Sequence, residues 1–222
     1  MVKSGVASSM ASVFAVAFIV LIVQVGLYGA KGQVESGFSQ VSLASSDLQI
    51  QKPYDVPQSA RYSFINGVHK LWVYSTDKPY APNSSTKPRT EIRILNHDYS
   101  SGTWQFEAYG YVPSGTTGVS IMQIFGGSPQ ATTLMLRVYN GALQYYQAQF
   151  VDPNIYNRWF RLNVVHNVDL SKVRVYIDGV QKLSVNGRGG TSHYFKVGVY
   201  TQNNPSNYME SRWRDIKIFK RN

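Results

Sequence analysis

Short segments of alternating hydrophobic and polar residues follow one another along most of the chain, separated by glycine, proline and asparagine. Alternation with a period of two residues is typical of strands that bury one face. In residues 133–139 the polar face, with Arg137 and Tyr139, has the character of an ordinary solvent face. The pattern predicts strands over residues 71–74, 90–95, 104–112, 120–125, 133–139, 143–150, 159–165, 172–177, 181–185, 194–201 and 213–219.

Two dipeptides predict tight turns between these strands. Asp178-Gly179 and Asn140-Gly141 suit the positive φ angles of a type I′ hairpin turn. Many short strands with turns at this spacing, and no long helical periodicity, favour an all-β antiparallel sandwich or barrel. The 222 residues contain no repeat or linker, and they are enough for a single domain with a substantial core.

The first 30 residues have the pattern of a signal peptide. Lys3 precedes an apolar run, and small residues then favour cleavage near Ala30 or Gly32. An uncleaved membrane anchor is the alternative, but Gln24 interrupts the run and no charge cluster follows it. We expect residues 31–46 to be a flexible lead-in and residues 47–222 to form the β domain. On a secretory route, the sequon at Asn83 predicts a glycosylation site.

The charge of the chain narrows the classes of ligand. Its formal net charge is +10, and removal of the signal peptide would take away a single charged residue. A basic secretory protein favours an anionic partner, whereas nucleic acid is disfavoured because no lysine- or arginine-rich run occurs. The absence of cysteine excludes disulfides and thiol chemistry. No His, Asp or Glu cluster has metal-ligand spacing, so we expect neither a metal nor a cofactor.

The stretch RTEIRI, residues 89–94, concentrates charge on one face of a predicted strand. Arg89, Glu91 and Arg93 lie on that face, and uncharged residues alternate with them. Ion pairing to Glu91 would position two guanidiniums whose outer donors could bind a carboxylate in a bidentate manner. Taken alone, such a face is more typical of a solvent-exposed ladder of salt bridges.

Two further predicted strands carry unusual polar faces. Gln123 lies beside Phe125 in IMQIFGG, and Gly198 leaves space above the sheet in YFKVGVYTQ, residues 194–202. The face that includes Gly198 carries the side chains of Tyr194, Lys196, Tyr200 and Gln202. Together the three faces predict a site for a carboxylate or a sugar, with cations for carboxylates and with phenols and amides for hydroxyl groups.

The motifs RTEIR, QIF and YFKVGVYTQ, in this order, resemble the three motifs of the alginate lyases of polysaccharide lyase family seven. Longer stretches, among them DYSSGTWQFEAYGYVPSGT and NIYNRWFRLNVVH, are similar to plant citrate-binding proteins over nearly the whole chain after the signal peptide. The resemblance implies a single-domain β-jelly-roll sandwich of two antiparallel sheets with a concave groove. It also implies a carboxylate ligand, either citrate or a uronate-containing polysaccharide, and an association with the vacuole.

The lyase resemblance also implies roles for single residues. Arg89 and Arg93 would neutralise a uronate carboxylate with help from Gln123. Tyr200 would give or take the proton during β-elimination. The groove would also be lined by Lys196 and Gln202.

One residue departs from the lyase pattern. Where the family has Gln-x-His, this chain has Phe125, which cannot act as a base. His193 lies next to the third motif, but its parity in the strand is opposite to that of Tyr194, so it would point away from the groove.

The sequence therefore favours a non-catalytic protein that binds citrate or a related carboxylate. Its ligand-binding residues would be Arg89, Glu91, Arg93, Gln123, Tyr194, Lys196, Tyr200 and Gln202. The alternatives are a polyuronate lyase in which Tyr200 is catalytic and a wall-polysaccharide binding module. We expect a monomer, at most peripherally bound to a membrane, in the vacuole or in the cell wall.

Overall fold

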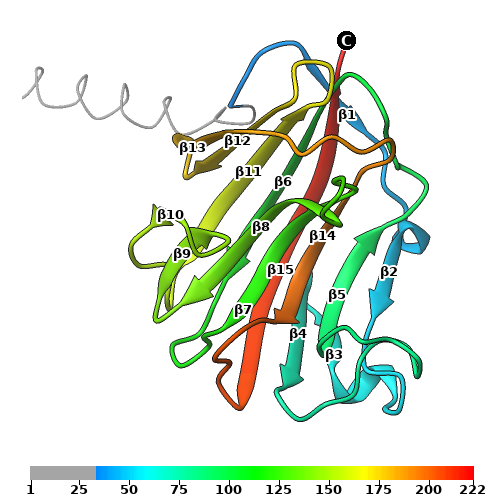
Figure 1. Cartoon of the computed structure of the whole chain (residues 1–222), viewed down its shortest axis with the longest axis vertical. Coiled ribbons are helices and arrows are strands. Elements are labelled where there is room, and N and C mark those ends of the chain that lie inside the picture. Colours follow the sequence, from blue (N-terminus) through cyan, green and yellow to red (C-terminus); the bar gives the residue numbers. More distant parts are fainter. Residues whose placement is uncertain (1–33) are drawn as a thin grey trace, which may run out of the picture. The chain divides into compact units, whose positions relative to one another are not determined.

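The computed structural model describes residues 34–222, so the predicted signal peptide lies outside the described residues. The described residues form two antiparallel β-sheets, one in front of the other in Figure 1. Helical structure among them is confined to two 3₁₀ turns, η1 (Ser45–Asp47) and η2 (Gln58–Ala60). The predicted all-β sandwich is confirmed.

The two sheets are built from strands that are distant in sequence. The eight-stranded sheet has the order β13 (Val180–Asn186), β12 (Lys172–Ile177), β11 (Trp159–Asn167), β6 (Thr103–Tyr111), β15 (Tyr208–Arg221), β4 (Val68–Tyr74) and β3 (Tyr62–Ile65), and β1 (Phe38–Val41) also pairs with β15. The seven-stranded sheet has the order β10 (Gln149–Asp152), β9 (Ala142–Tyr145), β8 (Thr132–Tyr139), β7 (Val119–Phe125), β14 (Tyr194–Thr201), β5 (Arg89–Ile94) and β2 (Leu48–Gln51).

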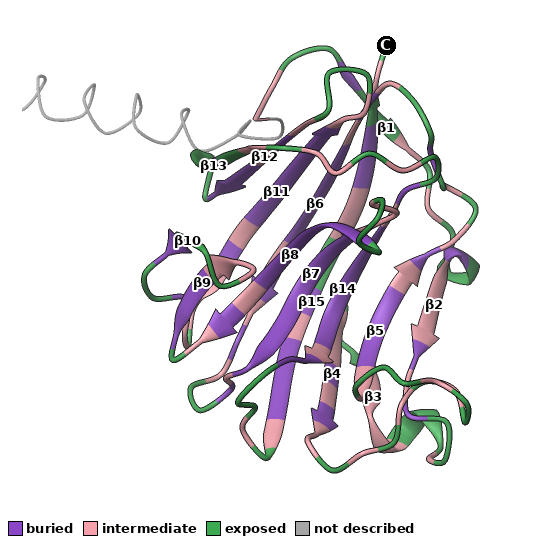
Figure 2. Ribbon diagram, in the orientation of Figure 1, coloured by how far each residue is buried: buried purple, intermediate pink, exposed green. Residues whose placement is uncertain are grey.

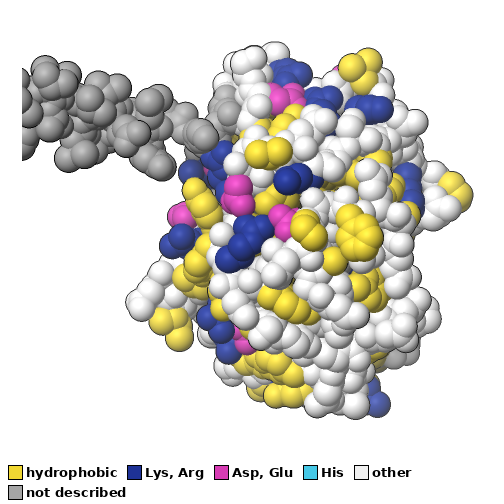
Figure 3. All heavy atoms as spheres, turned by 90° about the vertical axis from the view of Figure 1, so that its left-hand side faces the viewer, with side chains coloured by type: hydrophobic (Ala, Val, Ile, Leu, Met, Phe, Trp, Pro, Cys, Tyr) yellow, Lys and Arg dark blue, Asp and Glu magenta, His cyan; other side chains and the backbone are white. Residues whose placement is uncertain are grey.

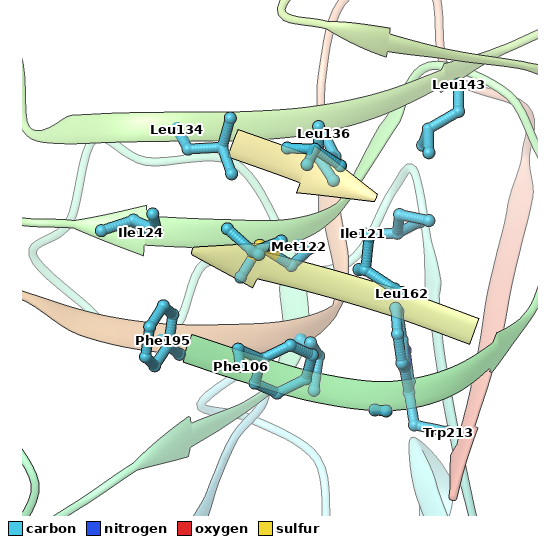
Figure 4. Packing of buried hydrophobic residues seen from close by; sticks show 14 of the residues in the cluster. Phe106, Ile121, Met122, Ile124, Leu134, Leu136, Leu143, Leu162, Phe195 and Trp213 are labelled. Carbon is cyan, nitrogen blue, oxygen red and sulfur yellow. The ribbon is translucent and has the colours of Figure 1, made fainter. Parts of the chain in front are cut away.

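The hydrophobic core lies between the sheets, because alternate residues of each strand turn toward the opposite sheet. Figure 2 shows the central strands mostly buried and the connecting loops mostly exposed. Aromatic and aliphatic side chains from both sheets meet in this layer, among them Phe106, Met122, Leu136, Leu162 and Trp213, all of them fully buried (Figure 4).

Each predicted strand is present, but residues 143–150 form two strands instead of one. Tyr146 has a φ angle of 51°, and a turn bond from the Ala148 amide to the Tyr145 carbonyl, 3.0 Å long, separates β9 from β10. The predicted glycine turns are confirmed by the positive φ angles of Asp178 and Asn140, 52° and 49°. The short strands β1, β2 and β3 were not predicted.

Part of the predicted flexible lead-in belongs to the domain. Within residues 31–46, the structure describes residues 34–46, and Phe38–Val41 form β1 along β15. Phe38 is buried, and the carboxylate of Glu35 accepts hydrogen bonds from Arg174, at 2.6 Å, and from Arg221. Apolar burial and this ion-pair cluster hold the segment against the eight-stranded sheet, which its polar sequence did not indicate.

Many Lys and Arg side chains of the domain are paired with acidic side chains. Figure 3 views the domain from the left-hand side of Figure 1, and there Lys and Arg side chains lie next to Asp and Glu side chains. Arg158, for example, pairs with Asp152 at 2.8 Å and with Asp178 at 2.9 Å. The net charge therefore does not locate a ligand site by itself, and the local geometry has to do so.

Candidate functional site

The three strands with unusual polar faces are neighbours in the seven-stranded sheet, in the order β7-β14-β5. Lys196 pairs with Arg93 on one side and with Gln123 on the other, and Tyr200 pairs with Arg89. The residues between them, such as Ile92 and Val197, belong to the core. We call the opposite side of this sheet the outer face; it carries Arg89, Glu91, Arg93, Gln123, Phe125, Arg137, Tyr194, Lys196 and Tyr200.

A buried charged cluster lies at the centre of the outer face. Glu91, Gln123 and Lys196 are only 1–2 % exposed. The Lys196 ammonium donates to Oε2 of Glu91 at 2.6 Å, and the Gln123 amide donates to Oε1. Burial lowers the pKa of Lys196, and the neighbouring Glu91 carboxylate opposes that shift. The expectation that Lys196 lines the ligand surface is therefore corrected, because its charge is neutralised inside the protein.

Two arginines stack on tyrosines on either side of this cluster. The guanidinium carbon of Arg89 lies 4.0 Å from the ring centre of Tyr200, and that of Arg93 lies 3.9 Å from the ring centre of Tyr194. Such stacking fixes the plane of a guanidinium and leaves its N–H groups pointing outward along its edge. Both side chains remain partly accessible, at 13 % for Arg89 and 26 % for Arg93.

The two guanidiniums differ in how well the protein already satisfies them. Arg93 donates to Asp98 at 2.8 Å, which is a good ion pair, while Arg89 reaches Glu91 only at 3.4 Å. Glu91 therefore orients Arg89 alone, whereas the sequence led us to expect that it orients both arginines. Arg89 is therefore the guanidinium with the weaker carboxylate partner inside the protein.

Phe125 uses the position of the expected histidine for packing. Its ring stacks on Tyr194, with ring centres 4.9 Å apart and planes 16° apart. Because Arg93 also lies over Tyr194, the three side chains form one column of aromatic and guanidinium planes. This column has no proton acceptor for carbon acid chemistry at the position where the lyase motif has its base.

All four histidines of the chain fall within the described residues, and none of them lies on the outer face. His193 and His166 are 1 % and 2 % exposed, and their rings meet between the sheets at 4.7 Å. Tyr99 shares a hydrogen bond of 3.1 Å with Nδ1 of His166. His69 lies on β4 of the other sheet, and His97 lies in the loop after β5. His193 therefore points away from the outer face, the direction that its parity in the strand predicted.

Gln202 does not offer its amide to the outer face. The amide nitrogen donates to the carbonyl oxygens of Thr201, at 2.9 Å, and of Tyr200, at 3.3 Å. The residue is also buried, at 8 % exposed. The strand parity that placed Gln202 with Tyr200 ends with β14 at Thr201, so the expected contribution of Gln202 to a ligand site finds no support in its contacts.

Arg137 was missed by the sequence analysis, although it shares the outer face. Ser120 pairs with Tyr200 on one side and with Arg137 on the other, so a single row crosses the sheet from Arg89 through Tyr200 and Ser120 to Arg137. The alternation in residues 133–139 looked like an ordinary solvent face. Its relation to the charged strands depends on the order of strands in the sheet, which the local pattern does not contain.

Glycine is required at position 198 by the conformation and close packing of the backbone, and not because a ligand needs open space above the sheet. Its φ angle is 143°, and a Cβ atom would lie 2.3 Å from the carbonyl oxygen of Thr90 and 2.7 Å from Cα of Glu91. We expect Gly198→Ala to destabilise the domain by about 3 kcal/mol, from backbone strain together with a backbone clash.

Urea unfolding would measure this loss. Gly102→Ala is the matched control, because Gly102 also has a positive φ angle, 75°, but has open space around a Cβ atom. The control isolates the backbone strain, about 1–2 kcal/mol. Equal losses in the two variants would show that the close approach of β5 costs nothing.

Comparison with known proteins identifies the family of this chain. Residues 41–220 match the model of the alginate lyase family. A Hevea brasiliensis protein described as a citrate-binding protein is 54 % identical over 185 residues, which is 83 % of this chain and 78 % of that protein.

Solved alginate lyases have the same fold. AlgAT5 from polysaccharide lyase family 7 is 20 % identical, with a TM-score of 0.60, and the match covers 82 % of this chain and 94 % of that one. The enzyme from Corynebacterium sp. is 18 % identical, with a TM-score of 0.60, and the match covers 82 % and 92 %. At these identities the likeness concerns the jelly-roll fold alone. Because the family model spans most of the described domain, the chain belongs to the alginate lyase family.

Proposed function

We propose that the outer face binds citrate or a related carboxylate and does not cleave it. The observation that carries this proposal is the Arg89–Tyr200 stack, where a partly accessible guanidinium has only one long contact to a carboxylate, at 3.4 Å. Guanidinium edges bind carboxylates through paired N–H···O bonds. The identity of 54 % to a citrate-binding protein supports citrate as the first ligand to test.

Arg89 carries the ligand carboxylate in this proposal, and Arg93 has a lesser part. The two residues are four positions apart on β5, so their Cα atoms are about 13 Å apart at the usual rise of a strand. Arg93 also leans over Tyr194, which lies beyond its paired residue Lys196. A single citrate therefore contacts one of the two guanidiniums, and Arg89 is the one with the longer, weaker contact to a carboxylate of the protein, 3.4 Å against 2.8 Å.

The non-catalytic part of the proposal rests on the groups around Tyr200. Proton abstraction beside a carboxylate needs a positioned base. Phe125 occupies the position of the family's histidine, and Lys196 is tied to Glu91 at 2.6 Å. Tyr200, which stacks with Arg89, is then the candidate group beside the bound carboxylate that could both accept and return a proton.

Calorimetric titration with citrate in a buffer without carboxylates tests the proposal. We expect saturable binding to the purified chain and at least a tenfold weaker affinity in Arg89→Gln, because a hydrogen bond to a charged group contributes about 1.5–3 kcal/mol. Arg93→Gln is the internal comparison and should change the affinity much less. Wild-type affinity in Arg89→Gln would remove this residue from the site.

The same preparation decides between binding and cleavage. Incubation with alginate, glucuronan or pectate, followed by ultraviolet absorbance, detects the unsaturated uronate that β-elimination produces. We expect no increase in absorbance. A steady increase in the wild-type protein that disappears in Tyr200→Phe would refute the non-catalytic part of the proposal and identify a lyase.

A further inference from the structure

Two arginines from separate segments converge on the ring of Tyr146 at the far side of the outer face. The guanidinium carbon of Arg188 lies 4.1 Å from the ring centre of Tyr146, and that of Arg137 lies 5.0 Å from the same ring centre. The Tyr146 hydroxyl donates to the Thr132 carbonyl at 2.8 Å, which holds the ring in place. Two cations thus share one fixed phenol.

The backbone positions each member of this group. Arg137 lies on β8, and the Tyr146 amide donates to the Met135 carbonyl of the same strand at 3.0 Å. Arg188 lies in the segment between β13 and β14, where its carbonyl accepts a 2.8 Å bond from the Ser128 amide. The convergence is therefore built into the loop and strand geometry.

Neither guanidinium has a carboxylate partner among residues 34–222. Arg137 donates only to the sulfur of Met135, at 3.2 Å, and its Nε is buried without a partner. Arg188 contacts the rings of Tyr146 and Tyr145. Most other arginines of the described domain do have such partners: Arg61, Arg89, Arg93, Arg158, Arg174, Arg212, Arg214 and Arg221.

Two like charges held near one ring repel each other, and a bound anion would relieve this repulsion. Guanidinium donors in a fork suit a carboxylate. The oxygen of Tyr146, whose hydrogen is donated to Thr132, can accept a hydrogen bond from a hydroxyl group of the same ligand. We propose that Arg137, Arg188 and Tyr146 form a second carboxylate-binding site on the outer face.

This second site is separate from the one at Arg89. The row from Arg89 through Tyr200 and Ser120 to Arg137 crosses three strand spacings, about 14 Å between the end residues. The Arg137 guanidinium also leans toward Tyr146, which follows β9 on the far side of β8. One citrate molecule does not bridge this separation, so the second carboxylate belongs either to another small molecule or to another unit of a uronate chain.

Titration of the double variant Arg137→Gln/Arg188→Gln tests the second site. It also shows whether the bound carboxylate comes from a second small molecule or from another unit of a uronate chain. If the second site takes small molecules, the wild-type chain binds two citrates and the double variant binds one. If the second site binds another unit of a uronate chain, the wild-type protein and the double variant bind the same number of citrates, and the affinity of the double variant for trigalacturonate is at least tenfold lower. Unchanged citrate stoichiometry together with unchanged trigalacturonate affinity would overturn the proposal.

Matched controls keep this result distinct from a failure of the Arg89 site. Arg89→Gln should remove the first site and leave the contribution of Arg137 and Arg188 intact. Arg214→Gln removes a guanidinium that stacks on Trp159, at 4.6 Å, on the eight-stranded sheet, and should change neither titration. If the double variant fails to fold, the single variant Arg188→Gln, altered only in a loop, is titrated in its place and judged by the same outcomes.

Discussion

Replacement of Lys196 by methionine should destabilise the domain by about 3–5 kcal/mol, the usual cost of removing one partner of a buried ion pair. Methionine keeps most of the aliphatic volume, so the loss comes from charge and not from a cavity. The buried carboxylate of Glu91, 1 % exposed, would then retain the hydrogen bond from the Gln123 amide and the long contact to Arg89, at 3.4 Å. The sequence alone placed Lys196 in the lining of the groove, where its loss would leave the fold intact.

A second substitution shows whether the loss of stability comes from an unpaired buried charge or from poor packing of the methionine. Lys196→Met/Glu91→Gln removes both charges and keeps an amide oxygen for Gln123, so urea unfolding should show that most of the stability has returned. A single variant as stable as the wild type would mean that the pair contributes nothing. A double variant as unstable as the single one would mean that the methionine itself packs poorly.

Acidification should destabilise the domain through His166. Burial between the sheets lowers the pKa of His166 to about 3, and neighbouring His193 adds to this shift. In the unfolded chain a histidine titrates near its ordinary pKa of about 6.5. Stability is therefore unaffected by this group above about pH 6.5 and falls by about 1.4 kcal/mol per pH unit below it, down to the folded pKa. Over the whole window His166 removes about 4–5 kcal/mol.

Urea unfolding at a series of pH values measures this slope. His166→Gln keeps a side chain that can accept the hydrogen bond of Tyr99 but does not titrate, so its stability should fall less steeply between neutral pH and about pH 4. The lowered pKa values of Glu35 and Glu210 affect stability only at more acidic pH, because those groups stay ionised in both states above their ordinary pKa. Parallel slopes for the two proteins would show that His166 is protonated in the folded state.

The strands and turns of this chain could be predicted from the sequence because they depend on short-range properties. Alternation of apolar and polar residues selects an extended strand with one buried face, and Asp178-Gly179 suits a turn with positive φ angles. Where this local information is weak, the prediction failed. Strands β1, β2 and β3 have four residues each, and Tyr146 turns the chain without a glycine.

The sequence by itself also determined which residues of the candidate site share a face of their strand. The family that its lyase-like motifs indicated is the family whose model the chain matches. Only the tertiary structure decided which charges meet. Glu91 and Lys196 are 105 residues apart, and their contact at 2.6 Å follows from the pairing of β5 with β14. Arg137 and Arg188 converge on Tyr146 because loops and strands from distant segments meet there. The physical reason is that alternation is a property of neighbouring residues, whereas burial and charge partners depend on strand order and register.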